Sequence, residues 1–73
     1  MPKVLTNNVR VLRFHHNEMT QQELAKMVSV SRQTIVAIEK GKCSPSLEVA
    51  FKIADVFSVS IAEVFSYQEQ VDE

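Results

Sequence analysis

The sequence has few of the residues that break or cross-link a chain. Its 73 residues include one glycine, two prolines, one cysteine and no tryptophan. Loop-rich and all-β proteins need more turn residues, so this composition argues against both classes. Cys43 has no second cysteine to pair with, which excludes an internal disulfide. No apolar run approaches the ~18 residues of a membrane-spanning helix, so we expect a cytoplasmic protein without membrane contact.

An excess of positive charge is also missing. Eight Lys and Arg residues stand against nine Asp and Glu, a net charge of −1, whereas nucleic-acid-binding domains usually carry a basic surplus. The charge is unevenly divided, however. Residues 1–45 hold seven bases and three acids (+4), and residues 46–73 hold one base and six acids (−5). This asymmetry indicates a basic nucleic-acid-binding region followed by an acidic end, although short chains also divide unevenly by chance.

Helix-start patterns divide the chain into helices. Thr20 and Glu23 have the spacing of a capping box, in which each side chain bonds the other residue's backbone amide, and Ser60 and Glu63 repeat it. Ser31 and Ser46 are simple N-caps, and Gly41 is typical of a helix end. We expect an all-α, compact five-helix domain over residues 1–67, with a polar acidic tail at 68–73. The expected helices span about 7–16, 21–28, 32–40, 47–57 and 61–66.

The second and third expected helices are joined by a very short turn. Only Ser29, Val30 and Ser31 separate them, so the helices must cross steeply, as in a helix-turn-helix over about residues 20–39. We expect Val30 to fill the corner. Such corners also occur with a purely structural role.

Helical periodicity gives the expected third helix an unusual outer face. Ile35 and Ile38 define its core side. An ordinary exposed face would carry Glu and Lys, but this one carries an amide, a guanidinium and small apolar groups, which suit bases in a DNA major groove. A protein–protein contact is the alternative interpretation. The outward residues are Arg32, Gln33, Thr34, Val36 and Ala37.

The expected second helix buries Leu24, Ala25, Met27 and Val28, and its N-terminus can bind a phosphate because its backbone amides are free. Basic side chains follow the third helix, where a DNA backbone could pass, although a merely solvated role is equally open for them. The expected phosphate contacts are Thr20, Gln21, Ser31, Lys40 and Lys42.

The expected fourth helix is apolar nearly all round, so it must be covered on most sides. This pattern predicts the central core helix, with some surface left for a second copy of the chain; a fully monomeric core is the alternative. The candidate homodimer surface is Val49, Ile53, Val56, Phe65 and Tyr67.

No pattern of residues indicates an enzyme, a cofactor or a metal. His15 and His16 are adjacent, so on a helix they point about 100° apart and cannot share an ion as an i, i+4 pair can. Cys43 is distant from both, and the chain has neither a CxxC motif nor a glycine-rich phosphate loop.

In this order the motifs resemble those of the Cro- and phage-repressor-like (XRE-type) helix-turn-helix family, in its small stand-alone form. The similar stretches, within about residues 8–67, are 20–25, 31–35, 38–42, 45–57 and 59–65. The resemblance implies a lambda-repressor-like domain that binds double-stranded DNA as a dimer. It also implies base contacts from Arg32, Gln33 and Ala37, with Thr34 near the bases. Gln21 would contact phosphate, and Arg13 would form a structural ion pair with Glu39.

The sequence departs from the family pattern at one residue and in one connection. A glycine usually precedes the third helix where this chain has Ser29, and a left-handed backbone there costs a serine roughly 1 kcal/mol. The connection over residues 15–19 also lacks a glycine and is one residue longer. The expected function is sequence-specific DNA binding as a small regulator, a homodimeric repressor. The alternative is a protein-interaction module on the same fold, with an unknown partner protein.

Overall fold

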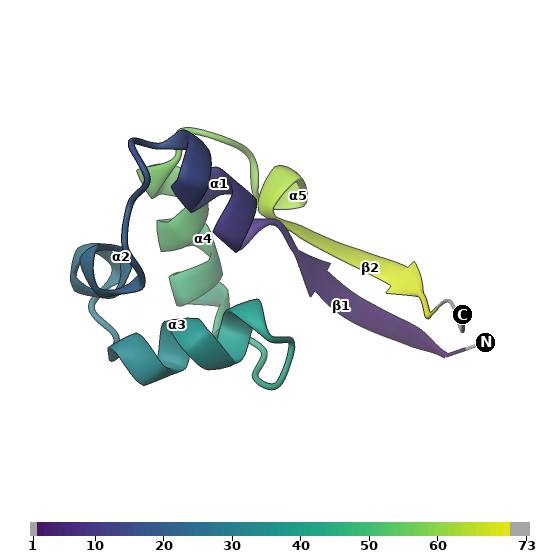
Figure 1. Ribbon diagram of the computed structural model, residues 1–73. Helices are drawn as coiled ribbons and strands as arrows, with labels where there is room; N and C mark the ends of the chain where they lie inside the picture. The colour runs from purple at the N-terminus through teal and green to yellow at the C-terminus, as the bar shows by residue number, and fades with distance from the viewer. Residues whose placement is uncertain (1, 71–73) are drawn as a thin grey trace.

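The computed structural model describes residues 2–70, which form a helical bundle and a two-stranded ribbon (Figure 1). The ribbon projects from one side of the bundle, and its end at Lys3 and Glu69 lies farthest from the helices. In chain order the elements are β1 (Lys3–Asn7), α1 (Val9–His15), α2 (Gln21–Val28), α3 (Arg32–Glu39), α4 (Leu47–Val56), α5 (Ile61–Val64) and β2 (Phe65–Glu69).

The two strands correct the expectation of an all-α fold. β1 pairs with β2 in antiparallel register, from Lys3 opposite Glu69 to Asn7 opposite Phe65. The first helix therefore begins at Val9 rather than near residue 7, and the last ends at Val64 rather than near 66. Residues 68 and 69 of the expected tail belong to β2, while 71–73 lie outside the described residues. Neither strand could be identified locally, because its partner is almost a chain length away.

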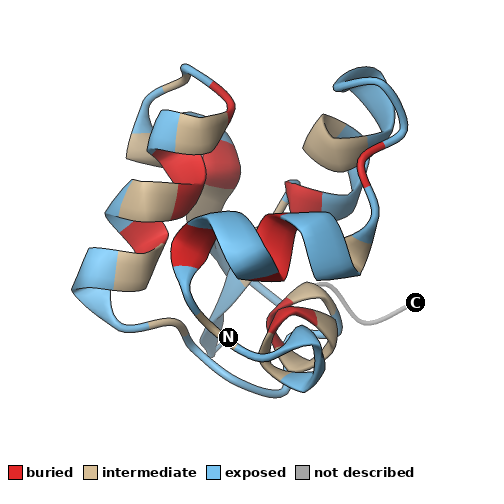
Figure 2. Ribbon diagram, turned by 90° about the vertical axis from the view of Figure 1, so that its left-hand side faces the viewer, coloured by how far each residue is buried: buried red, intermediate tan, exposed pale blue. Residues whose placement is uncertain are grey.

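The core lies where the five helices meet, and Figure 2 shows buried positions on their inward sides. Two expectations are wrong here. Met27 was expected to be buried but is 56% exposed, and the side chain of Met19, in the connection before α2, is buried in the core instead. Ile53 is fully buried, so it cannot belong to a dimer surface. The largest fully buried side chains are Leu24, Ile35, Ile38, Ile53, Val9, Val28 and Val64.

The corner between α2 and α3 has the expected left-handed residue. Ser29 has φ 61° and ψ 44°, and the amide of Val30 donates to the carbonyl of Ala25 over 3.0 Å. The side chain of Val30 packs against the core cluster, as expected for a residue that fills the corner. In the α1–α2 connection, Asn17 and Glu18 take positive φ angles of 55° and 51°, so the turn forms without glycine.

Asn7 joins the ribbon to the bundle. Its side-chain Nδ2 donates to the carbonyl of Ile38 over 2.9 Å, and its Oδ1 accepts from the amide of Val9 over 3.1 Å. One amide side chain therefore links the end of β1, the start of α1 and the last turn of α3.

Candidate nucleic-acid interface

Side-chain caps fix the first turns of α2 and α3. Thr20 Oγ1 accepts from the amide of Glu23, and the amide of Thr20 donates to Glu23 Oε1, each over 3.0 Å. This capping box lowers the pKa of Glu23 below its usual 4.5, first through the backbone amide of Thr20 and then through its hydroxyl. At α3, Ser31 Oγ accepts from the amide of Thr34 over 3.1 Å. Both caps leave a hydroxyl at the helix N-terminus.

The outer side of α3 divides into an exposed start and a half-buried middle. Arg32 and Gln33 are exposed, while Thr34, Val36 and Ala37 are half-buried. Ile35 and Ile38 point into the core, as the helical periodicity predicts. A major groove could therefore be contacted first by the guanidinium and amide at the start of the helix.

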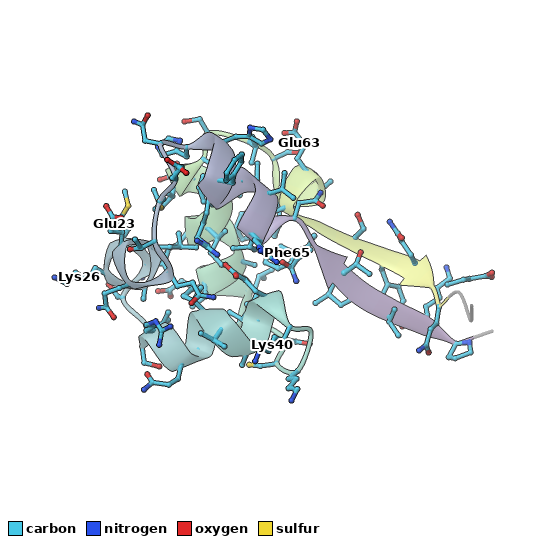
Figure 3. The ribbon with its side chains drawn as sticks, in the orientation of Figure 1. Glu23, Lys26, Lys40, Glu63 and Phe65 are labelled. Carbon is cyan, nitrogen blue, oxygen red and sulfur yellow. The ribbon has the colours of Figure 1, made fainter. Side chains whose placement is uncertain are left out.

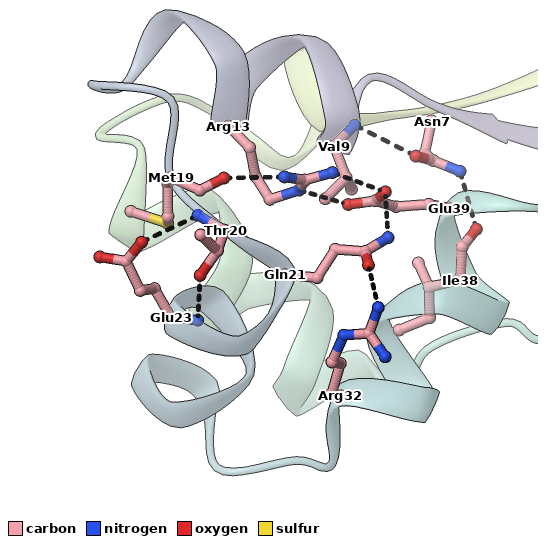
Figure 4. A network of polar contacts seen from close by, with 10 residues as sticks. All are labelled: Asn7, Val9, Arg13, Met19, Thr20, Gln21, Glu23, Arg32, Ile38 and Glu39. Carbon is pink, nitrogen blue, oxygen red and sulfur yellow. Dashed lines mark hydrogen bonds and ion pairs between the residues drawn. The ribbon is translucent and has the colours of Figure 1, made fainter.

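A polar network links the exposed start of α3 to α1 and α2 (Figure 4). Arg13 Nε donates to Glu39 Oε2 over 2.6 Å, and Arg13 Nη2 donates to Glu39 Oε1 over 2.9 Å. The ion pair implied by the family resemblance is thus present. Gln21 Nε2 donates to Glu39 Oε1 over 3.1 Å, and Arg32 Nη2 donates to Gln21 Oε1 over 3.4 Å. Gln21 therefore connects Arg32 to a partly buried ion pair.

Three helices enclose an open groove beside this network, with a volume of about 520 Å³. Its lining comes from α1, the start of α2 and the second half of α3 with the following residue. Sequence reasoning missed Arg10 as part of this site; its spacing of three residues from Arg13 places both on one helix face and could have indicated it. The lining residues are Arg10, Arg13, Thr20, Gln21, Val36, Glu39 and Lys40.

Of the remaining phosphate candidates, Lys40 lines the groove, whereas Lys42 and Ser31 lie outside it. Lys40 follows α3 at the end nearer the ribbon (Figure 3) and lines the groove. Lys42 is exposed in the next loop, where its amide donates to the carbonyl of Ala37 over 2.9 Å. Ser31 is exposed at the opposite end of α3. The candidate phosphate contacts thus extend along the whole helix.

The candidate dimer residues fall elsewhere and differ in exposure. Val49, Val56 and Phe65 are half-buried against the core, whereas Tyr67 on β2 is 68% exposed. Sequence reasoning did not select Leu47 and Phe51, one turn apart on α4, although both are mostly exposed.

Within residues 2–70, no group of three or more His, Cys, Asp or Glu residues lies close enough together to hold a metal ion. No helix in this part of the chain is long and apolar enough to span a membrane.

Known proteins are similar to this chain in sequence and in fold. A helix-turn-helix family model matches residues 15–64. An uncharacterised HTH-type transcriptional regulator of Methanocaldococcus jannaschii is 52% identical over 65 residues, which cover 89% of this chain and 97% of the relative. The cryptic phage CTXphi transcriptional repressor RstR of Vibrio cholerae is 37% identical over 71 residues, 96% of this chain and 63% of the relative.

A solved structure of a proposed DNA-binding protein from Bacteroides fragilis has the same fold, with a TM-score of 0.74 and 24% identity. The similarity covers 86% of this chain and all of the other. The family match over more than half of the chain and the identity to these regulators show that this chain belongs to the XRE-type helix-turn-helix transcriptional regulators.

Proposed function

We propose that this regulator binds double-stranded DNA sequence-specifically, with α3 in the major groove, and acts in the cytoplasm as a repressor. The observation that carries the proposal is the position of Arg32: it is exposed at the start of α3 and hydrogen-bonded to Gln21 at the start of α2. A braced guanidinium on an outward helix face is suited to bidentate recognition of guanine. The relative RstR is named a transcriptional repressor.

The proposed base contacts are graded by exposure. Arg32 and Gln33 are exposed, so they can reach base edges, the first toward guanine and the second toward adenine. Thr34 and Ala37 are half-buried and have short side chains, and we assign them apolar contacts, in which their methyl groups pack against a thymine methyl.

The proposed phosphate contacts come from the helix ends. Thr20 and Ser31 are exposed at the N-termini of α2 and α3, where their hydroxyl groups can reach phosphate oxygens. Gln21 adds an amide at the start of α2, where the helix dipole favours an anion. Lys40 and Lys42 extend the positive charge past α3. Such contacts position the protein and carry little sequence information.

We further propose that two copies bind a two-fold operator, with their α3 helices about 34 Å apart. Tyr67 is the one member of the predicted dimer surface that is mostly exposed, and we retain it at the interface. A repressor of this kind would block access to the DNA that it covers.

Selection of bound duplexes from a random pool tests the function. We expect one enriched, two-fold sequence, with binding that weakens steeply between about 50 and 200 mM salt. Arg32→Ala should then reduce the free energy of DNA binding by about 1–3 kcal/mol and relax the preference at one base position of each half-site. A uniform loss for all sequences would make Arg32 a phosphate contact. Absence of binding to any duplex would favour a protein-interaction module.

A further inference from the structure

The groove between α1, α2 and α3 holds positive charge that the protein does not use internally. Three of its lining side chains are cationic (Arg10, Arg13 and Lys40) and one, Glu39, is anionic. Arg13 and Glu39 neutralise each other, with their side chains only 14% and 8% exposed. Within the described residues, Arg10 and Lys40 form no ion pair, so they leave the groove with two uncompensated charges.

The two cations belong to different helical segments. Arg10 lies on α1, Lys40 directly follows α3, and Thr20 and Gln21 at the start of α2 also line the groove. Arginine offers a planar fork of donors and lysine a flexible ammonium, and both suit the oxygens of a phosphate. The groove therefore presents cations and a helix N-terminus toward the same volume, which favours a single anionic group over an apolar ligand.

The groove is continuous with the proposed DNA-reading face. Val36 belongs to the outward side of α3 and also lines the groove, and Gln21 lines the groove while it accepts from Arg32. A duplex that receives α3 in its major groove must therefore pass its backbone close to this opening. The occupant that fits both the charge and the position is a DNA phosphodiester.

We infer that Arg10 is a DNA-backbone contact, and that Arg10 and Lys40 together hold a phosphodiester in this groove. The inference rests on the proposed DNA binding and adds a contact from α1. The Arg13–Glu39 pair also lines the groove, and Arg13 neutralises the negative charge of Glu39, which would otherwise repel a phosphate there. Arg10 strengthens binding without reading bases.

The experiment compares Arg10→Gln with Arg10→Lys and with Lys52→Gln. The last variant removes the same charge from α4, where Lys52 pairs with Glu48 outside the groove. Binding is measured by fluorescence anisotropy against the selected duplex and an unrelated one at several salt concentrations. Circular dichroism melting checks the fold, which we expect to be unchanged because Arg10 is exposed.

We expect Arg10→Gln to weaken binding to both duplexes by the same factor. The slope of log affinity against log salt should become shallower by about 0.9 per protomer bound, while Arg10→Lys keeps most of the slope and Lys52→Gln all of it. A wild-type slope in Arg10→Gln, or a changed preference at one base, would overturn the inference and leave the DNA-binding function standing. Failure of the wild type to bind any duplex would overturn both.

A competition experiment distinguishes a DNA backbone from a free anion as the occupant of the groove. Bound DNA is titrated with inorganic phosphate and, in parallel, with chloride at the same ionic strength. We expect phosphate to displace DNA no better than chloride does, from the wild type and from Arg10→Gln alike, because a single phosphate ion makes none of the other contacts of the duplex. Displacement of DNA from the wild type at phosphate concentrations that leave Arg10→Gln bound would assign the groove to a free anion and contradict the inference.

Discussion

Arg13 and Glu39 join the first and third helices through two hydrogen bonds, of 2.6 Å from Nε and 2.9 Å from Nη2. A third donor, Arg13 Nη1, reaches the carbonyl of Met19 over 2.7 Å and so fixes the end of the α1–α2 connection. The pair thus holds α1, the approach to α2 and the end of α3 in one arrangement. The orientation of the proposed DNA-reading helix depends on it.

Arg13→Met should destabilise the protein strongly. It leaves the carboxylate of Glu39, whose side chain is 8% exposed, without its charged partner, and breaking such a pair from one side costs about 3 kcal/mol. Urea denaturation measures the loss. The double variant R13M/E39M removes both charges and should recover a large part of it. A double variant no more stable than the single one would show that packing, not the unpaired charge, dominates.

Ser29→Gly should stabilise the fold. Ser29 has a left-handed backbone with φ 61°, which a side chain disfavours and glycine adopts freely. We expect the free energy of unfolding to rise by about 0.5–1 kcal/mol, since the greater freedom of glycine in the unfolded chain offsets part of the gain. Gly41→Ala is the matched opposite: Gly41 has φ 74° with open space around it, so a loss of stability there reflects the left-handed backbone and not a steric clash. If both variants changed the free energy of unfolding in the same direction, this explanation would be wrong.

Glu23→Gln should remove a pH-dependent part of the stability. The bonds from Thr20 depress the pKa of Glu23 in the folded state below 4.5, so its contribution is present above 4.5 and disappears as the pH falls through the folded pKa. Melting temperatures of wild type and variant should therefore differ at neutral pH and converge in acid. Asp55→Asn removes an exposed carboxylate from α4 as a charge control. A pH-independent offset for Glu23→Gln would assign its effect to something other than ionisation.

The helices were predictable because their caps are local. Thr20 with Glu23, Ser31 and Ser46 are all readable within four residues, and α2, α3 and α4 begin where these residues place them. The left-handed Ser29 and the Arg13–Glu39 pair came instead from the family resemblance.

The remaining features depend on contacts between distant segments. The ribbon pairs residues near opposite ends of the chain, so five-residue strands gave no periodic pattern to detect. Arg10 joins the groove only because α1 lies against α2 and α3. Met27 was expected inside on periodicity, but Met19 from the preceding connection fills the core, and α2 turns Met27 outward.

Gln21→Ala should affect both the strength and the selectivity of DNA binding. Gln21 donates to Glu39 over 3.1 Å and accepts from Arg32 over 3.4 Å, so its loss removes a proposed phosphate contact and also frees the guanidinium of Arg32. We expect weaker binding to all duplexes, together with a relaxed preference at the base that Arg32 reads. Both should appear in a competition assay against operators substituted one base pair at a time.

Two variants separate the two roles of Gln21. Gln22→Ala removes the same side chain from the next, exposed position of α2, which has no side-chain hydrogen bond within residues 2–70, and should leave the base preference intact. Lys42→Ala should weaken binding uniformly, as a phosphate contact does. If Gln21→Ala resembles Lys42→Ala and spares the base preference, then Arg32 is positioned by its own packing on α3, and the bridge through Gln21 has no part in reading the sequence.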